Sequence, residues 1–156
     1  MRKLTTLTVV FIVFTMCLRA QDVTNKDGLY YSNTGKLYSG VYTNYNNKKI
    51  KTFDLTIVDG KAIGKVTYFY DNGSVSETGS FFDNEKNGEW NRFDEKGNKT
   101  AVAFYLNGKK DGTWTIWDFN GIKRCEMHYA VGEKTGTWKM WDENGLLSNE
   151  KTYSPI

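Results

Sequence analysis

The sequence predicts an all-β protein, an elongated and twisted antiparallel sheet built from stacked β-hairpin repeats of 24 residues. Three observations support this prediction. A glycine recurs at a fixed interval, large side chains stand at fixed offsets from it, and turn-forming residues alternate with short apolar stretches. The glycines predict five units over residues 40–156, which start at Gly40, Gly64, Gly88, Gly112 and Gly136.

Large side chains occupy three fixed positions in the units. The second residue after the starting glycine is large, with Trp90, Trp114 and Trp138 as the clearest examples. The fifth position is aromatic in every unit and holds Tyr45, Phe69, Phe93, Trp117 and Trp141. The seventeenth position holds Ile57, Phe81, Tyr105, Tyr129 and Tyr153. Each unit therefore supplies large side chains to two successive strands.

Turn residues separate these strands. A second glycine, nine residues after the first, ends turns such as 71–73, 94–97, 118–121 and 142–145, each of which begins with Asp. The carboxylate of Asp can bond back to backbone amides, and Gly adopts positive φ without a steric penalty. The second strand alternates, as Cys125, Met127 and Tyr129 show. The first strand does not, so either both of its faces are partly covered or a bulge resets its register.

Residues 1–20 differ from the rest and are predicted to be a secretory signal peptide. Arg2 and Lys3 begin the segment, an apolar stretch follows, and cleavage is expected after Ala20. An uncleaved anchor and a lipoprotein signal with lipidation at Cys17 stand as alternatives. We expect an exported protein (periplasmic, at the cell surface or secreted) with no integral membrane span in the mature chain. Residues 21–39 are predicted to form a shortened opening repeat and cap.

Charge argues against nucleic acid as a partner. The leader holds three basic residues and no acid, which accounts for the net charge of +3 and leaves 18 Lys and Arg against 18 Asp and Glu. Binding to nucleic acid depends on the neutralisation of phosphates by basic residues. We therefore expect no nucleic acid partner, and phospholipid binding ranks below protein or glycan binding.

Catalysis is not expected, because the residues it requires do not occur together. His128 is the only histidine, and Cys125 would be the only cysteine of the mature chain, so the usual zinc sites cannot be built within a monomer. Cys125 is interpreted as a packed thiol. The acids Asp94, Asp118 and Asp142 offer oxygen ligands for calcium, but only one or two side-chain oxygens per turn, and are interpreted as turn-forming residues. We expect no enzyme, no metal and no cofactor.

The best copies of the unit begin at Gly88, Gly112 and Gly136 and read GEWNRFD, GTWTIWD and GTWKMWD. These columns resemble the MORN-type repeat in its bacterial variant form, over essentially the whole mature chain. The unit at Gly40 departs most, because Asn46 to Lys49 stand where the turn glycine is expected. The resemblance implies an open sheet used as a binding or scaffolding surface. Many bacterial members are described as antitoxin or immunity partners of toxins.

Two aromatic sets carry the functional prediction. The repeat core is predicted to be Trp90, Trp114, Trp138, Phe81, Tyr105 and Tyr129. If one face is open, the candidate partner-binding residues are Phe69, Phe93, Trp117 and Trp141. The predicted function is an exported, non-catalytic scaffold for a protein partner, with an antitoxin or immunity-type role implied by the resemblance. The alternative is a module that binds cell wall or polysaccharide through an exposed aromatic row.

Overall fold

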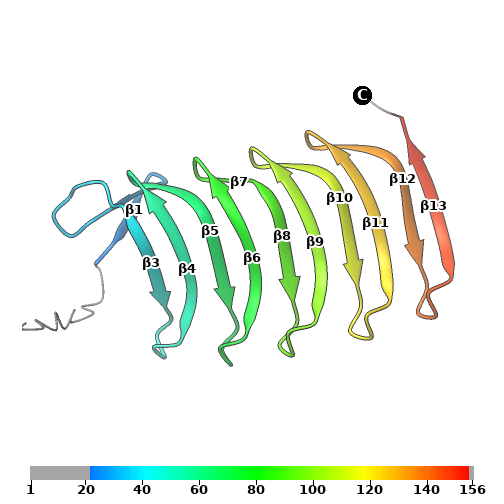
Figure 1. Cartoon of the computed structure of the whole chain (residues 1–156), viewed down its shortest axis with the longest axis horizontal. Coiled ribbons are helices and arrows are strands. Elements are labelled where there is room, and N and C mark those ends of the chain that lie inside the picture. The colour runs from blue at the N-terminus through cyan, green and yellow to red at the C-terminus, as the bar shows by residue number, and fades with distance from the viewer. Residues whose placement is uncertain (1–21, 155–156) are drawn as a thin grey trace, which may run out of the picture.

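The computed structural model describes residues 22–154, so the predicted leader, with its cleavage after Ala20 and the alternative at Cys17, lies outside the described residues. The described chain forms an 11-stranded antiparallel sheet and a separate two-stranded sheet. Hairpins stand side by side in chain order (Figure 1), which confirms the predicted all-β fold. The strands are β1 (Thr24–Lys26), β2 (Leu29–Tyr31), β3 (Gly40–Tyr45), β4 (Lys51–Val58), β5 (Lys61–Phe69), β6 (Val75–Phe82), β7 (Glu85–Lys86), β8 (Gly88–Phe93), β9 (Lys99–Leu106), β10 (Lys109–Trp117), β11 (Lys123–Ala130), β12 (Glu133–Trp141) and β13 (Leu147–Tyr153).

Two-residue turns join one hairpin to the next. In the turn at Asn107 and Gly108, both residues have positive φ, 46° and 75°. Two successive positive φ values define a type I′ turn, whose twist matches that of the flanking strands. In the turn after β6, Asn84 takes the place of glycine at φ 69°, because Asn tolerates the left-handed region.

Val131 departs from the chemistry of these turns. It holds the first position of the last two-residue turn between hairpins, at φ 48°. A β-branched residue is strained at positive φ. The residue is 55% exposed, so its side chain contributes little packing. We expect Val131→Asn to raise the free energy of unfolding by about 1 kcal/mol, measured by urea denaturation. Val58→Asn is the control, since Val58 is also exposed but has no positive φ, and an equal gain there would contradict the backbone explanation.

The glycines that start the units at Gly64, Gly112 and Gly136 lie in β-bulges, where pairing with the preceding strand is interrupted. Gly112 has φ 64°, and the pairing of β10 with β9 is interrupted between Asp111 and Thr115. At this bulge, the indole Nε1 of Trp114 donates a hydrogen bond to the carbonyl of Phe104 at 2.9 Å. Figure 1 shows the resulting bend near the upper ends of β5, β10 and β12. The glycine column and the tryptophan column therefore belong to one local structure.

One face of the large sheet carries a continuous ladder of aromatic rings, and we call it the ladder face. Neighbouring ring centroids lie 4.9 to 6.1 Å apart. Lys86, Lys110 and Lys134 place their Nζ atoms 3.7, 4.4 and 4.7 Å from the centroids of tryptophan rings, within cation–π range. The ladder consists of Phe81, Trp90, Tyr105, Trp114, Tyr129, Trp138 and Tyr153.

The N-terminal end of the ladder face has a second layer, made by the β1–β2 hairpin. The ring of Tyr30 in β2 lies 5.9 Å from that of Tyr42 in β3, and the backbone N–H of Tyr30 donates to the carbonyl of Gly60. Beneath this layer, Leu55 and Val66 are 4% and 1% exposed. The first two units therefore share a compact apolar core with residues that precede them.

A second bulge lies in the second strand of each hairpin, next to the turn. Ile116 pairs with Cys125, whereas Trp117 pairs with Lys123, so Arg124 is the extra residue. The same shift occurs in the other four hairpins. The first strand itself alternates regularly, so Trp114 and Trp117 lie on opposite faces and are both half-buried. Of the two explanations offered by the sequence, partial cover of both faces is the one that applies.

Candidate functional site

The four candidate partner-binding residues lie on the face opposite the ladder. Trp114 pairs with Met127 on the ladder face, and strand alternation places Trp117 on the other side. All four are half-buried, and they recur on every second strand, so neighbours stand roughly 10 Å apart. We call Phe69, Phe93, Trp117 and Trp141 the aromatic row.

Lysines on the neighbouring strands make cation–π contacts with two rings of the aromatic row. Lys51 Nζ lies 4.1 Å from the ring centroid of Phe69 and 2.8 Å from a carboxylate oxygen of Asp54. Lys123 Nζ lies 4.9 Å from the ring centroid of Trp141. These contacts restrict the rings before any partner arrives, which lowers the entropy that binding would cost.

The single histidine belongs to a polar cluster on the same face. His128 Nδ1 lies 3.1 Å from Thr113 Oγ1, and its Nε2 lies 3.8 Å from a carboxylate oxygen of Glu126. Lys123 donates to the other oxygen of Glu126 at 2.8 Å, and this bond is the main reason why the pKa of Glu126 lies below its ordinary value. These side chains satisfy one another on an open sheet, so we assign them a structural role. Cys125 is a half-buried free thiol on the ladder face.

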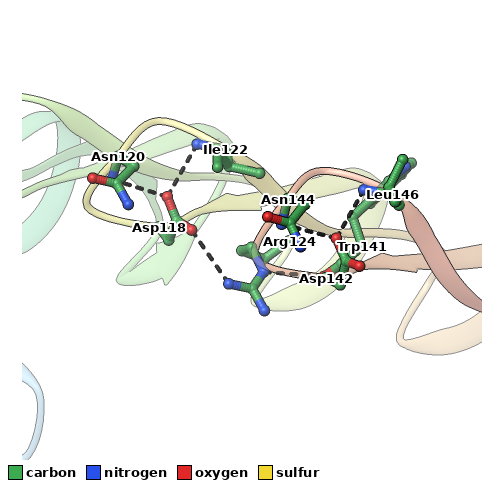
Figure 2. Close-up of polar contacts among 8 residues, drawn as sticks. All are labelled: Asp118, Asn120, Ile122, Arg124, Trp141, Asp142, Asn144 and Leu146. Carbon is green, nitrogen blue, oxygen red and sulfur yellow. Dashed lines mark hydrogen bonds and ion pairs between the residues drawn. The ribbon is translucent and has the colours of Figure 1, made fainter.

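Below the aromatic row, the turn acids accept hydrogen bonds from their own turns, as Figure 2 shows for two units. Asp118 accepts from the backbone N–H groups of Asn120 and Ile122 at 2.9 and 3.0 Å. Its second oxygen lies 3.3 Å from Arg124 Nη1. Arg124 also donates from Nε to the carbonyl of Trp141 at 3.0 Å. This guanidinium therefore joins two neighbouring units next to the aromatic row.

In the second unit, the interpretation of Asp71 as the turn-forming acid is wrong. Tyr70 occupies the place that Asp94 holds in the next unit, because the turn begins one residue earlier than the sequence suggested. Asn72 supplies the side-chain acceptor instead, for the N–H of Ser74 at 2.9 Å. The hydroxyl of Tyr70 donates to the carbonyl of Phe93 at 2.7 Å. A tyrosine thus provides the link between turns in this unit.

The turn acids make stability depend on pH. Desolvation raises the pKa of Asp118, but hydrogen bonds from Ile122 and Arg124 outweigh it, so the net pKa is lowered. The pKa of Asp94 is lowered chiefly by the side-chain amide of Asn98. A carboxyl group whose pKa is lower in the folded state adds stability above its unfolded pKa and loses it as pH falls through the folded pKa.

We therefore expect the free energy of unfolding to fall as pH drops below about 4 and to change little between about pH 5 and 7. Urea titrations at a series of pH values measure this. Asp118→Asn should make the decline shallower, because one of the linked carboxylates is gone. Glu143→Gln, which changes an exposed acid, is the control, and equal slopes for the wild type and Asp118→Asn would contradict the assignment.

The residues predicted as repeat core lie on the ladder face. Trp90, Trp138 and Tyr129 are 2%, 9% and 9% exposed. Phe81, Tyr105 and Trp114 are half-buried members of the same ladder. The lysines over the rings were not predicted, although Lys86, Lys110 and Lys134 each stand two residues before a starting glycine in the sequence.

Three segments of the chain match a family model described as the MORN repeat variant, at residues 63–84, 110–130 and 134–154. Three hairpins are therefore similar to MORN repeats. These MORN-type hairpins are β5–β6, β10–β11 and β12–β13. MORN repeats suggest a repeat scaffold, which agrees with the open array of hairpins.

No curated protein matches the chain. Among solved structures, a chain of the crystal structure of the GtfA/B complex bound to UDP and GlcNAc matches with 10% identity and a TM-score of 0.28. The match covers 85% of this chain and 24% of that one, so this chain spans about a quarter of the length of that one. Similarity at that level does not bear on fold or function.

Two further features concern only residues 22–154. No helix in this part of the chain is long and apolar enough to cross a membrane. Nor does this part of the chain contain a cluster of three or more His, Cys, Asp or Glu side chains that could hold a metal ion.

Proposed function

We propose that this chain is an exported, non-catalytic scaffold that binds a protein partner through the aromatic row. The observation that carries the proposal is the position of Phe69, Phe93, Trp117 and Trp141 in one line, half-buried, on the face opposite the ladder. Aromatic side chains that are partly packed against their own protein and partly exposed to solvent are typical anchors of protein interfaces. An immunity-type role, in which the partner is a toxin, is the finer form of this proposal and rests on the family resemblance.

Export is part of the proposal and rests on the leader sequence. It predicts a mature protein that begins at Gln21 when the full chain is expressed in a bacterial host. N-terminal sequencing of the protein from the envelope fraction tests this. An intact Met1, or a chain that stays with the cytosolic fraction, would remove the exported role and leave the binding surface to be tested separately.

The binding test is a pull-down from the envelope fraction with the mature chain and with Trp117→Ala/Trp141→Ala. We expect the wild type to retain one protein in near-stoichiometric amount, and the double variant to lose it while remaining folded. Phe119→Ala is the matched control, because Phe119 is 83% exposed and lies outside the aromatic row. Equal capture by the double variant would place the partner elsewhere on the scaffold.

A polysaccharide is the second candidate ligand, favoured by the spacing of the aromatic row. One ring on every second strand gives a repeat of roughly 10 Å, which is close to the disaccharide repeat of a β-1,4-linked glycan. Hydroxyl groups of Thr113, Thr137 and Thr152 lie on the same face. Retention on insoluble peptidoglycan or chitin, lost in Trp117→Ala/Trp141→Ala, would support a glycan, whereas capture of a single protein would support the first proposal.

A further inference from the structure

A row of residues below the aromatic ladder crosses the whole ladder face. Along the sheet it changes from aromatic to charged and then to apolar side chains. Successive strands bring its members into direct cross-strand register. Phe53 and Tyr68 lie at the N-terminal end, and Glu77 pairs with Arg92 in the middle. From β9 to β12 the row is apolar and consists of Ala101, Ile116, Cys125 and Met140, one residue on each strand. It ends at the polar residue Asn149 in β13.

These apolar residues form a patch that the described chain leaves uncovered. Ile116 and Met140 are 39% and 41% exposed. Under the β1–β2 hairpin, Leu55 and Val66 are 4% and 1% exposed. Leu55 occupies the unit position of Ala103 and Met127, and Val66 occupies that of Trp114 and Trp138. Next to Ile116, a depression of about 140 Å³ forms over Ala101 and Ala103, and its lining includes the charged side chains of Glu77, Lys86 and Arg92. We call Ala101, Ala103, Ile116, Cys125, Met127 and Met140 the C-terminal patch.

Within the chain, one segment already packs on the ladder face. At the N-terminal end, the β1–β2 hairpin lies across β4 to β6 and lines a shared space with Phe53, Leu55 and Tyr68. It inserts one central aromatic residue, Tyr30, against Tyr42. Because the units repeat the same hairpin backbone, the C-terminal patch offers the same arrangement of strands to an equivalent segment. Two methionines make it adaptable to different side chains.

The charges around the C-terminal patch indicate which residues should flank the anchor of a bound segment. Lys110, Lys134 and Lys151 border the patch, and their Nζ atoms lie 4.4, 4.7 and 5.1 Å from aromatic ring centroids. Within residues 22–154, none of the three forms an ion pair with a carboxylate. Lys86, at the other end of the ladder, does so with Glu77. Three cations free of carboxylates beside an apolar surface favour an acidic ligand.

We infer that the C-terminal patch docks a hairpin or extended segment of a partner protein, with one aromatic or large aliphatic anchor flanked by acidic residues. The anchor enters the depression over Ala101 and Ala103, and the acidic residues pair with Lys110 and Lys134. A second copy of this chain is a poorer occupant, because its own β1–β2 hairpin is already packed on its own ladder face. This site lies opposite the aromatic row and does not depend on the proposed function.

The probe is a display library of twelve-residue hairpin peptides, with acidic and basic members equally represented, selected on the mature chain. Enriched peptides are expected to carry one central aromatic or aliphatic residue flanked by Asp or Glu. Their dissociation constants should rise about tenfold or more on Ile116→Ser/Met140→Ser. Lys110→Gln/Lys134→Gln should weaken binding and reduce its salt dependence, since the aliphatic stems stay but the charges are lost.

Two matched variants make the test specific to this patch. Val41→Ser/Val58→Ser removes exposed apolar side chains in the first unit, far along the sheet from the patch, and should leave binding unchanged. Trp117→Ala/Trp141→Ala should also leave it unchanged, which separates this site from the aromatic row. Circular dichroism establishes that each variant is folded. The inference is overturned if no peptide is enriched, if enriched peptides lack acidic flanks, or if the folded patch variant binds them as tightly as the wild type.

Discussion

Gly79→Ala is expected to lower the free energy of unfolding by about 3 kcal/mol. A β-carbon on residue 79 would overlap the Cδ2 and Cε2 atoms of Trp90, whose ring lies directly on the glycine. Trp90 is 2% exposed and packs edge-on against Phe81 and Tyr105, so its ring has no space in which to move. Urea denaturation of both proteins, with an unchanged m-value, measures the loss.

Two further variants show whether the steric clash with Trp90 causes the loss of stability. Gly97→Ala meets no atom within 4 Å but holds φ 86°, so it should cost only about 1 kcal/mol for the backbone. Trp90→Leu should relieve the clash, so that Gly79→Ala costs much less in that background. If Gly79→Ala costs the same with tryptophan and with leucine at residue 90, the steric explanation fails.

The second large effect is expected at Trp114, where substitution by alanine should cost about 4 kcal/mol. Its ring lies 5.1 Å from Tyr105 and 5.3 Å from Tyr129, between centroids, so its removal breaks the ladder on both sides. It also leaves the carbonyl of Phe104 without the indole donor. Thermal and urea unfolding measure the loss.

Trp117→Ala is the matched control, because it removes the same side chain three residues away on the opposite face. It should cost roughly 1 kcal/mol, as expected for a half-buried residue outside the core. Trp114→Phe should fall between the two, since it keeps a ring but loses the hydrogen bond to Phe104. Equal losses for Trp114→Ala and Trp117→Ala would contradict the assignment of the ladder as the core.

The repeating part of the fold could be predicted from the sequence because its determinants are local. Turn glycines, Asp and Asn, and the alternation in residues such as Cys125 and Met127 act within a few positions of the chain. The placement of Trp114 and Trp117 on opposite faces follows from the same parity. Asp71 was misplaced because two polar residues stand before Gly73, and only backbone bonding decides which position opens the turn.

The non-local features could not be predicted in the same way. The sequence of residues 24–31 does not indicate that this hairpin packs over the ladder face and does not extend the large sheet. The link from Arg124 to the carbonyl of Trp141 also depends on the distance between units. For the candidate site, the sequence names the members of the aromatic row, but only the packing of strands decides how much of each ring is exposed.

The indole bonds of the ladder also bear on how the length of this chain can change. Trp90, Trp114 and Trp138 each donate to the carbonyl ten residues earlier, in Ser80, Phe104 and His128. If residues 88–111 were excised, Trp114 would stand ten residues after Ser80 and could form the bond that Trp90 forms now. Evolution can thus add or delete whole hairpins by recombination between copies, so that the length of the sheet changes while the junction chemistry stays the same.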